Sequence, residues 1–304
     1  MKYLLLGGSG FIGRHLAAML CKEHEVIVAD RAAFVAGMDM DTVSFCEFDF
    51  ATDDFEPLLT GVDCVFHLVS TVLPDVGTEN LIEEISANVL PTIRLLDAIA
   101  SRRGIKLYYF STGGAIYGEY DDRPASEESF LQPICKYGVH KLAIEKYMHL
   151  YHIYHGVDYR IFRPANPYSS KLYEGRTQGA LPIFLDKILL GKPIEIWGDG
   201  NILRDFVHIN DLLSAVRAIM GYCGDQRVFN IGSGSCISLN DLIALIAGIA
   251  KRPLPDIAYT NGRACDTRYS ELDISLIGHC TDWRPAISLA DGIRMCVADR
   301  QSAS

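Results

Sequence analysis

The 304-residue sequence lacks the long apolar runs, the signal peptide and the paired cysteines that mark several large classes of protein. No apolar run reaches the roughly 18 residues that a membrane-spanning helix needs. The N-terminal YLLL run is followed at once by glycines, which is typical of a buried strand and not of a signal peptide. The nine cysteines, an odd number, include no CxxC pair. We therefore expect a cytoplasmic protein with no membrane partner, whose cysteines fill apolar space in a reducing compartment.

An excess of positive charge is missing as well. The 28 Lys and Arg residues are outnumbered by 38 Asp and Glu residues, and the net charge of −10 predicts no nucleic-acid partner. A small anionic ligand would then need individual arginines or lysines. His149, His152 and His155 stand three apart near the end of a predicted helix, where they suit the helix dipole, so no metal site is expected.

What the sequence does have near its start is a group of glycines. Residues 2–6, KYLLL, predict a buried strand, and residues 11–23 have the apolar spacing of a helix. The segment between them satisfies G-x-G-x-x-G from Gly8 and G-x-x-G-x-x-G from Gly7. Between a strand and a helix, this pattern predicts backbone N–H groups that hold a pyrophosphate at the helix N-terminus. The cofactor contacts expected here are Gly7, Gly10, Phe11, Ile12 and Gly13.

An acidic residue ends the second predicted strand. Asp30 closes EVIVAD about 20 residues after the glycine turn, where a carboxylate accepts hydrogen bonds from the adenosine ribose and repels a 2′-phosphate. The sequence therefore favours NAD over NADP. Arg31 follows directly and could bind a 2′-phosphate, so NADP stays an alternative. Further cofactor contacts are expected from Asp49 and Phe50, after a third strand, and from Leu68 in a fourth.

Strands and helices alternate through the N-terminal half. Segments 42–47, 63–68 and 105–110 predict strands, and segment 80–101 predicts a helix. Pro91 would either kink this helix or lie near a turn of it. This alternation is typical of an α/β fold with a Rossmann-type, doubly wound parallel sheet, whose ligand lies at the carboxyl ends of the strands.

The alternation loosens after about residue 165, which predicts a smaller, mixed substrate-binding region. The expected domains are residues 1–165, which bind NAD and carry the catalytic helix, and residues 166–304, which mainly bind substrate and interleave with the sheet edge.

Tyr137 and Lys141, in YGVHKLAIEKY, share one face of a helix that is predicted after Pro133. Alone, the pair is as well explained by a lysine stem that packs against an exposed ring. A free phenol has a pKa near 10, so proton transfer at neutral pH needs a shift of about 3 units. Lys141 and the positive charge of an oxidised nicotinamide would both favour the phenolate, and beside a nicotinamide the pair has a reason to move protons.

Several segments along nearly the whole chain resemble the extended short-chain dehydrogenase/reductase superfamily, and within it the sugar-nucleotide epimerase/dehydratase group. They are, in order, GGSGFIG, Asp30, STGGAIYG, YGVHK, RPANPY, RDFVHINDL and WRPAISLADGI. The resemblance implies that Tyr137 takes the proton from a sugar hydroxyl while hydride leaves the same carbon, and that Lys141 supports the phenolate. It also implies a homodimer, formed by two long helices per subunit that match residues 80–101 and 134–155.

The loop after the fifth strand departs from the pattern of this group. Its members usually carry Ser or Thr four residues before the tyrosine of the YG pair, where this chain has Gly113. Ser111 and Thr112 lie just upstream, and either hydroxyl could bind the substrate oxygen or cap the strand; we favour Thr112. The Asp–Glu pair of the dehydratases is replaced by Gly114 and Ala115, which disfavours 4,6-dehydration and nucleotide-glucuronate decarboxylation.

Three residues of the C-terminal region match positions with which the group holds its nucleotide-sugar substrate. They are Asn166 in RPANPY, Arg204 in RDFVHI and Arg268 in ACDTRYSELD. On an acidic protein, a diphosphate needs the planar guanidinium donors of arginine. A structural ion pair is the alternative for each arginine, for Arg204 with Asp205 or Asp211.

The residues and the resemblance together predict an NAD-dependent 4-epimerase of a nucleotide-diphosphate hexose. UDP-glucose and UDP-galactose, or their N-acetylated forms, are the substrates that the resemblance implies. The enzyme would oxidise C4, let the 4-keto sugar turn over and return hydride to its opposite face. Two alternatives stay open: a 4-keto sugar-nucleotide reductase that consumes external NAD(P)H, and a non-catalytic dinucleotide sensor that keeps the fold.

Overall fold

The computed structural model describes residues 1–32, 42–71, 77–102, 104–119, 123–169 and 179–302, which form two compact units. Unit 1 consists of Met1–Thr112, Cys135–Phe162 and Asp225–Phe229, and unit 2 of Gly113–Ile134, Arg163–Gly224 and Asn230–Ser304. The boundary predicted near residue 165 lies close to the passage from Phe162 to Arg163, but the chain also exchanges segments 113–134 and 225–229 between the units. The assignment of cofactor and substrate to the two parts stays a prediction.

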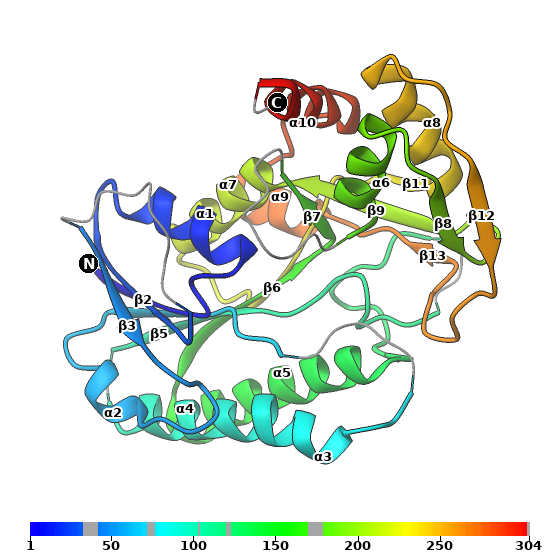
Figure 1. The fold of residues 1–304 in the computed structure, drawn as a ribbon. Helices are drawn as coiled ribbons and strands as arrows, with labels where there is room; N and C mark the ends of the chain where they lie inside the picture. The colour runs from blue at the N-terminus through cyan, green and yellow to red at the C-terminus, as the bar shows by residue number, and fades with distance from the viewer. Residues whose placement is uncertain (33–41, 72–76, 103, 120–122, 170–178, 303–304) are drawn as a thin grey trace. The chain divides into compact units, whose positions relative to one another are not determined.

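A seven-stranded sheet organises unit 1 (Figure 1), with the strand order β10-β6-β5-β4-β1-β2-β3. Its strands are β1 (Lys2–Leu6), β2 (Glu25–Asp30), β3 (Val43–Glu47), β4 (Cys64–His67), β5 (Lys106–Phe110), β6 (Asp158–Pro164) and β10 (Val228–Ile231). Neighbouring strands from β6 to β3 run parallel. The order reverses at β1, which confirms the predicted doubly wound sheet and places the expected ligand crevice at the carboxyl ends of β1 and β4.

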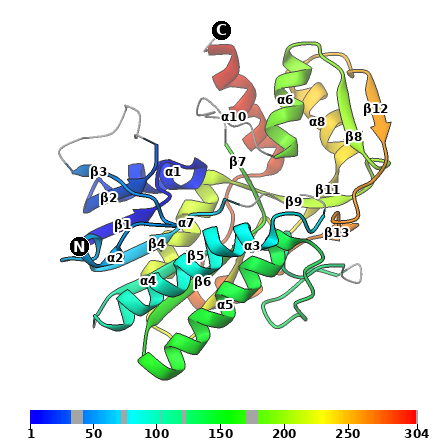
Figure 2. The same cartoon turned by 60° about the horizontal axis from the view of Figure 1, so that its bottom comes forward.

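Helices cover both faces of this sheet, and for that reason its strands are almost continuously apolar. Figures 1 and 2 show α1 (Phe11–Leu20) on one face, and α4 (Leu90–Ala100) and α5 (Lys136–His155) side by side on the other. The short α2 (Phe55–Leu58) follows β3. The core on the side of α4 and α5 includes Leu95, Leu96, Ile144 and Met148 from the helices and Val65 from the sheet.

The helix predicted over residues 80–101 is interrupted. It divides into α3 (Leu81–Glu84), a single π-helical turn η1 (Ile85–Val89) and α4, which has Pro91 in its first turn. Proline has no N–H to donate one turn back, so the ordinary hydrogen-bond ladder cannot continue through it, and π-turns of this kind often occur at functional sites. The turn directs Asn88 inward, where it is 5% exposed.

Unit 2 has mixed pairing, as predicted for the C-terminal region. Its larger sheet has the order β11-β9-β13, with β7 paired to β9, and β8 pairs with β12 in a second sheet. Strand β11 runs antiparallel to β9, whereas β13 and β7 run parallel to it. The strands are β7 (Asn166–Tyr168), β8 (Ile194–Trp197), β9 (Leu203–His208), β11 (Cys236–Ser238), β12 (Ile257–Thr260) and β13 (Tyr269–Ser270).

The helices of unit 2 are α6 (Ala180–Leu189), α7 (Ile209–Met220), α8 (Leu239–Ala250), α9 (Ser275–Thr281) and α10 (Leu289–Ser302). An apolar core of unit 2 includes Leu181 and Leu185 of α6, Leu242 and Ile246 of α8, and Ile293 of α10. In the described segments of both units, every helix is too short or too polar to cross a membrane.

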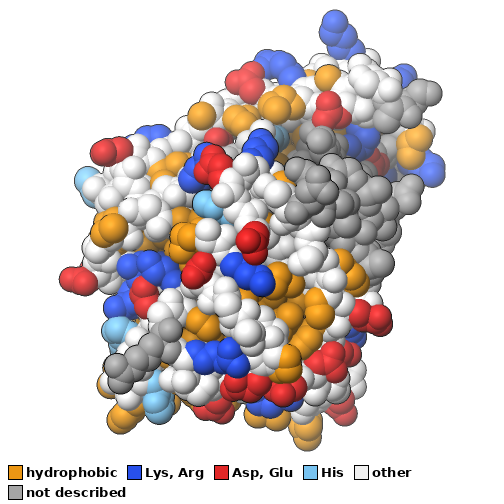
Figure 3. Space-filling view, turned by 90° about the vertical axis from the view of Figure 1, so that its left-hand side faces the viewer, with side chains coloured by type: hydrophobic (Ala, Val, Ile, Leu, Met, Phe, Trp, Pro, Cys, Tyr) orange, Lys and Arg blue, Asp and Glu red, His pale blue; other side chains and the backbone are white. Residues whose placement is uncertain are grey.

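On the face shown in Figure 3, acidic and basic side chains are interspersed and not gathered by sign. Recognition of an anion on such a surface depends on particular arginines.

Candidate active site

The glycine turn between β1 and α1 lets a ligand approach the backbone closely. Gly7 has a φ of +80°, which side chains rarely tolerate. A Cβ on Gly13 would lie 2.6 Å from the backbone of Gly8, so only glycine lets α1 begin against the turn. The helix starts after Gly10 without a side-chain cap from any described residue. The N–H groups of its first turn are therefore suited to a pyrophosphate, and these residues fit a dinucleotide.

Asp30 is held beside this turn by two backbone hydrogen bonds. Its Oδ2 accepts from the N–H of Ser9 at 3.1 Å, and its Oδ1 accepts from the N–H of Arg31 at 2.8 Å. A carboxylate oxygen has two lone pairs, so each oxygen can accept a further hydrogen bond, as recognition of a ribose requires. Arg31 itself is exposed. The preference for NAD over NADP rests on this carboxylate.

Three of the remaining predicted cofactor residues lie beside the glycine turn or at the start of α1: Leu68, Phe11 and Ile12. Leu68 borders the turn directly, because a Cβ on Gly7 would lie 3.2 Å from its carbonyl carbon. Phe11 is partly exposed and Ile12 partly buried at the start of α1.

Asp49 and Phe50 make contacts within unit 1. Asp49 accepts from the N–H of Ala51 at 2.9 Å, and Phe50 is buried against Phe55 and His67. Their predicted contact with adenine stays a prediction.

Tyr137 and Lys141 line one pocket of unit 1, which encloses about 210 Å³, in part open to solvent. The Nζ of Lys141 donates to the carbonyl oxygen of Phe110 at 2.7 Å. It lies 5.7 Å from the centre of the Tyr137 ring, and the lysine is 5% exposed. The predicted pair therefore shares a pocket, and Lys141 is fixed there by the end of β5. We call this the unit 1 pocket.

The structure distinguishes between the two predicted hydroxyl residues. The side chain of Thr112 hydrogen-bonds the phenol of Tyr137. Ser111 is buried, its N–H donates to the carbonyl oxygen of Phe162 at 2.8 Å, and its Oγ has no partner among the described residues. Thr112 is thus the hydroxyl that lies at the tyrosine, which supports the preference for it as the substrate-binding hydroxyl.

Burial governs the proton equilibria of the pair. It raises the pKa of Tyr137 to about 12, although the hydrogen bond with Thr112 acts in the opposite direction. It also lowers the pKa of Lys141 to about 7, against the attraction of Glu145. The pKa of the phenol therefore lies above its ordinary value in the protein without a dinucleotide. The sequence argument concerns the phenol beside Lys141 and an oxidised nicotinamide, and it stays a prediction.

Sequence reasoning missed other residues that line the unit 1 pocket, among them Asn88 and His140. Asn88 is held in place by the N–H of Thr71, which donates to its Oδ1 at 2.9 Å, and by its own Nδ2, which donates to the carbonyl oxygen of Glu84 at 2.8 Å. Pro91 is the sequence signal for Asn88, because a proline that cannot donate one turn back favours an irregular turn just before it, and Asn88 lies in that turn. His140 lies between Tyr137 and Lys141 in YGVHK, and the sequence analysis predicted no role for it.

Two arginines of unit 2 converge on one carboxylate. Arg263 makes a bidentate pair with Asp266, at 2.8 and 2.7 Å, and its guanidinium stacks 4.2 Å from the ring centre of Trp197. Arg204 lies 3.6 Å from the same carboxylate and donates to the carbonyl oxygen of Thr267 at 2.7 Å. Burial lowers the pKa of Arg204, and Arg263 adds to this effect. We call Arg204, Arg263 and Asp266 the Asp266 cluster; two cations share one anion, which leaves a net positive charge.

This cluster differs from the sequence expectation in two respects. The partner of Arg204 is Asp266, and not Asp205 or Asp211; Asp205 instead accepts from Ser233, and Asp211 from two backbone N–H groups. Arg263 was not predicted, whereas Arg268 was. Arg268 is largely exposed and pairs with Glu119 at 2.9 Å. An arginine that stacks on an exposed tryptophan far away in the sequence leaves no local signal.

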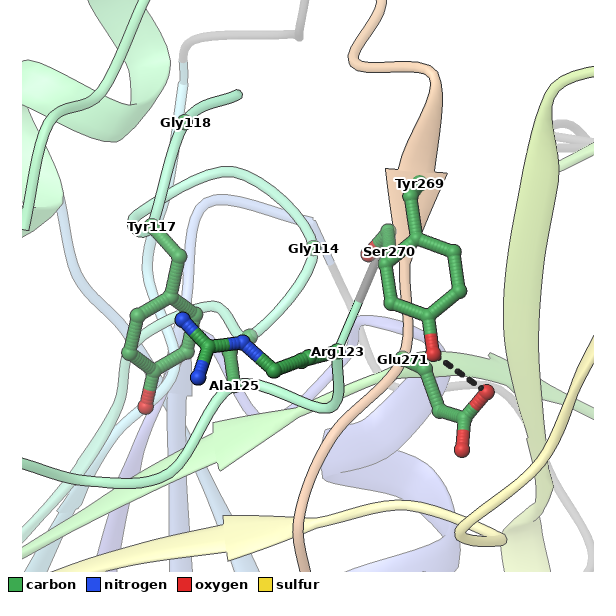
Figure 4. Close-up of a pocket in the computed structure, with 9 residues that line it drawn as sticks. Gly114, Tyr117, Gly118, Arg123, Ala125, Tyr269, Ser270 and Glu271 are labelled. Atoms are coloured by element: carbon green, nitrogen blue, oxygen red, sulfur yellow. Dashed lines mark hydrogen bonds between the residues drawn. The ribbon is translucent and has the colours of Figure 1, made fainter. Parts of the chain in front are cut away.

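Asn166 lies near a pocket of unit 2 that encloses about 250 Å³ including open solvent (Figure 4). A Cβ on Gly114, which lines this pocket, would lie 4.0 Å from the Oδ1 of Asn166. The Nδ2 of Asn166 donates to the carbonyl oxygen of Asp205 at 2.8 Å. Figure 4 shows the hydroxyl of Tyr269 directed at Glu271, to which it donates at 2.9 Å.

Gly113, where a serine or threonine was expected, has no room for a side chain. A Cβ there would lie 2.5 Å from Cδ1 of Leu272 and 3.0 Å from the carbonyl oxygen of Arg163. Leu272 is 1% exposed and cannot move aside freely. The departure from the group's pattern is therefore built into the packing of this chain.

A doubly wound sheet with a glycine turn, together with a tyrosine beside a buried lysine, defines a Rossmann-type enzyme that works with a dinucleotide. Residues 3–232 match the model of the NAD dependent epimerase/dehydratase family, and the chain belongs to this family. The prediction of an NAD-dependent enzyme of this family is thereby confirmed, and NAD is its cofactor.

Relatives with several activities are similar over nearly their whole length. A putative UDP-glucose 4-epimerase of Methanocaldococcus jannaschii is 30% identical, with 97% of this chain and 96% of the relative covered. A dTDP-4-dehydro-6-deoxyglucose reductase of Escherichia coli is 28% identical, with 95% and 94% covered.

Solved structures agree with these relatives. The UDP-glucose 4-epimerase of Thermotoga maritima with UDP-glucose has a TM-score of 0.90 and 29% identity over 100% of this chain and 99% of its own. The UDP-glucuronic acid 4-epimerase of Bacillus cereus with UDP-glucuronic acid and NAD has a TM-score of 0.89 and 25% identity, with both chains fully covered.

Proposed function

We propose that this protein catalyses the NAD-dependent 4-epimerisation of a nucleotide-diphosphate hexose, either UDP-glucose and UDP-galactose or their N-acetylated forms. The observation that carries the proposal is the unit 1 pocket, where the phenol of Tyr137 is hydrogen-bonded by Thr112 beside the buried Lys141. Relatives named as UDP-glucose 4-epimerases support it, since they match nearly the full chain. Gly114 and Ala115 support it as well, because they provide no carboxylate for dehydration.

The chain's own residues divide the work of proton transfer. When bound, NAD would supply the acceptor and later donor of hydride at C4. Tyr137 would take the proton of the C4 hydroxyl and return it, and Thr112 would orient the same oxygen. A phenolate at Tyr137 would raise the pKa of the neighbouring amine of Lys141. The lysine would then carry its charge when the phenol is ionised.

The arginines of unit 2 would hold the diphosphate. In the Asp266 cluster, Arg204 and Arg263 share a single carboxylate, and a diphosphate offers each guanidinium a bidentate partner. Arg268 is mostly exposed and already paired with Glu119, so we assign it a smaller share than the sequence did. Asn166 and the unit 2 pocket beside it would contact the sugar.

The deciding experiment is incubation of the purified protein with UDP-galactose and, separately, with UDP-N-acetylgalactosamine. NMR of the sugar ring then reads the configuration at C4. We expect interconversion with the gluco form without added NADH, because the cycle returns its cofactor oxidised. Absence of interconversion for both sugars, in protein that carries NAD, contradicts the proposal.

A 4-keto sugar-nucleotide reductase is the second candidate, favoured by the E. coli relative of that name. Such an enzyme would consume one NAD(P)H per turnover and would leave the protein with an oxidised dinucleotide to exchange. Purified protein that carries no nicotinamide, and turns over a 4-keto sugar nucleotide only with added NADPH, would establish this reading. A Tyr137→Phe protein that binds NAD and keeps its cellular role would establish the non-catalytic sensor instead.

We also propose that the protein is a homodimer. Its support is the apolar surface that α3, α4 and α5 expose, which includes Ile82, Leu90, Val139, Leu150 and Ile153. Contiguous exposed apolar residues on neighbouring helices are typical of an interface. Light scattering coupled to size exclusion should give about twice the 33.7 kDa of one chain, and Leu150→Lys should halve that mass.

A further inference from the structure

A buried group of charged residues beside the unit 1 pocket has no part in the reaction proposed above. Glu84, the last residue of α3, pairs with Lys136 at the start of α5, with 2.8 Å between Oε1 and Nζ. One turn further along α5, the Nδ1 of His140 lies 3.9 Å from the Oε2 of Glu84. The three side chains are 17%, 7% and 8% exposed, in that order. We call Glu84, Lys136 and His140 the Glu84 cluster.

Two atoms of this cluster face each other without a partner. Among the described residues, neither the Oε2 of Glu84 nor the Nδ1 of His140 makes a hydrogen bond, and both are buried. Such atoms are rare in native proteins. A small movement would bring them from 3.9 Å into hydrogen-bond range. Each atom is therefore the available partner of the other.

The protonation of His140 decides whether this contact attracts or repels. Burial lowers the pKa of His140, and Lys136 adds to the effect, while Glu84 opposes it. The imidazole is therefore neutral near pH 7 and carries one N–H, on Nδ1 or on Nε2. A proton on Nδ1 would be donated to the carboxylate, whereas a bare Nδ1 would set two lone pairs against each other.

The cluster holds the segments that carry the reacting groups. Lys136 and His140 are neighbours one turn apart on α5 and stand on either side of Tyr137 in the sequence. The backbone carbonyl of Glu84 accepts from Asn88, which lines the unit 1 pocket together with Tyr137, Lys141 and His140. Glu84 thus joins the start of the catalytic helix to the π-turn.

We propose that His140 is a positioning residue, whose Nδ1–H donates to the Oε2 of Glu84 and so fixes the first two turns of α5 with Tyr137 in the orientation that proton transfer requires. The orientation of Tyr137 needs such support because it is the second residue of the helix, where helices fray. If the Tyr137 side chain is not held in place, the substrate still binds, but the phenol meets the sugar hydroxyl less often, and kcat falls. The catalytic part rests on the proposed function; the hydrogen bond does not.

A matched pair of variants tests the catalytic part. His140→Gln keeps an N–H that can reach Glu84, and His140→Leu keeps the bulk without a donor. We expect His140→Leu to lower kcat about tenfold with KM changed less than about twofold, and His140→Gln to stay within about threefold of the native kcat. An unchanged kcat in His140→Leu, or equal losses in both variants, overturns the proposal.

Nitrogen-15 NMR of the NAD-loaded protein tests the hydrogen bond itself. We expect the Nδ1 of His140 to be protonated near pH 7 and its signal to shift in Glu84→Gln. Glu56→Gln, which breaks the exposed ion pair with Arg102 away from the pocket, is the control and should leave the signal unchanged. A proton on Nε2 alone, or a signal that Glu84→Gln does not move, overturns the proposal.

The two tests separate the proposal from the proposed function. If the native protein turns over no nucleotide sugar, the proposed function fails, and the NMR result alone decides whether His140 binds Glu84. Should His140→Leu fail to fold, Lys136→Met takes its place. Loss of the ion pair should then lower kcat in the folded protein, and an unchanged kcat would again overturn the positioning role.

Discussion

Lys141 in unit 1 and Arg263 in unit 2 are both cations that the proposed reaction uses, but the protein treats them differently. Lys141 is 5% exposed and donates to a backbone carbonyl, and burial lowers its pKa to about 7. Arg263 keeps part of its surface in water and is neutralised by Asp266. The lysine is removed from water and held by a hydrogen bond to Phe110, whereas the arginine is held by an ion pair that a phosphate would replace in the proposed complex.

This difference indicates what each unit is built to do. In the unit 1 pocket, burial brings the pKa of an amine near neutrality, so a small change of charge moves a proton. In the Asp266 cluster a guanidinium never loses its proton under physiological conditions, so its part in the proposed reaction would be to bind and release an anion. Variants that exchange or remove these groups test the comparison.

The largest effect is expected from Tyr137→Phe. General acid–base catalysis contributes about 100- to 10,000-fold, so loss of the hydroxyl should lower kcat by about 1,000-fold. The phenyl ring fills the same space, and NAD binding should stay intact. The NMR assay of C4 configuration measures the rate, and dinucleotide released on denaturation measures the cofactor. A variant within tenfold of the native rate would remove proton transfer from the proposed role of this residue.

Lys141→Met should reduce activity and raise stability together. Each pKa unit corresponds to about 1.4 kcal/mol, so a fall from 10.5 to about 7 lowers the free energy of unfolding by about 4–5 kcal/mol at neutral pH. Loss of the hydrogen bond to Phe110 returns about 1 kcal/mol of that gain. The methionine variant should therefore unfold at a higher temperature than the NAD-free native protein, with kcat lowered about 100-fold.

The pH dependence of this stability difference follows from the direction of the shift. The folded pKa lies below the unfolded one, so between about pH 7 and 10.5 the unfolded state binds a proton that the folded state lacks. The penalty is complete below pH 7 and disappears as the pH rises toward 10.5. Denaturant unfolding at pH 7 and pH 9.5 should show a clearly smaller advantage of Lys141→Met at the higher pH, and an equal advantage at both would contradict burial as the cause.

Arg263→Met should weaken substrate binding more than it slows the reaction. A hydrogen bond to a charged group is worth about 1.5–3 kcal/mol, which corresponds to a rise of KM by about 10- to 100-fold. Arg268→Met is the matched control, because Arg268 is 80% exposed and pairs with Glu119. It should change KM by less than about threefold, since exposed ion pairs contribute little. The reverse order of the two variants would restore the assignment made from the sequence.

The smallest effect is expected from Gly113→Ser, which supplies the hydroxyl that the family resemblance led us to expect at this position. Its Cβ would meet Leu272 at 2.5 Å, and overpacking of this kind costs about 1–3 kcal/mol. We expect a lower melting temperature and no gain in kcat, because Thr112 already binds the phenol. A gain in kcat would show that the hydroxyl of Thr112 is not the one that the reaction uses.

Local patterns predicted much of the fold and of the unit 1 pocket. The strand predicted at EVIVAD coincides with β2, and the helix predicted over residues 134–155 corresponds to α5. The spacing of Tyr137 and Lys141 placed them on one face because a helix repeats every few residues, whatever surrounds it. The sequence predicted a kink or turn of the helix near Pro91. It did not predict that this irregularity is a π-turn that directs Asn88 inward.

What the sequence determined by itself is therefore local: the alternation of strands and helices, the glycine turn before α1, Asp30 at the end of β2, and the tyrosine–lysine pair. Only the tertiary structure decided that Thr112 and not Ser111 meets the phenol, that Leu272 excludes a side chain at Gly113, and that Arg263 joins Arg204 at Asp266. It also placed the phenol of Tyr137 where burial raises its pKa in the protein without a dinucleotide. Hydrogen-bond periodicity acts between near neighbours in the chain, whereas burial and the convergence of charges depend on segments that only folding brings together.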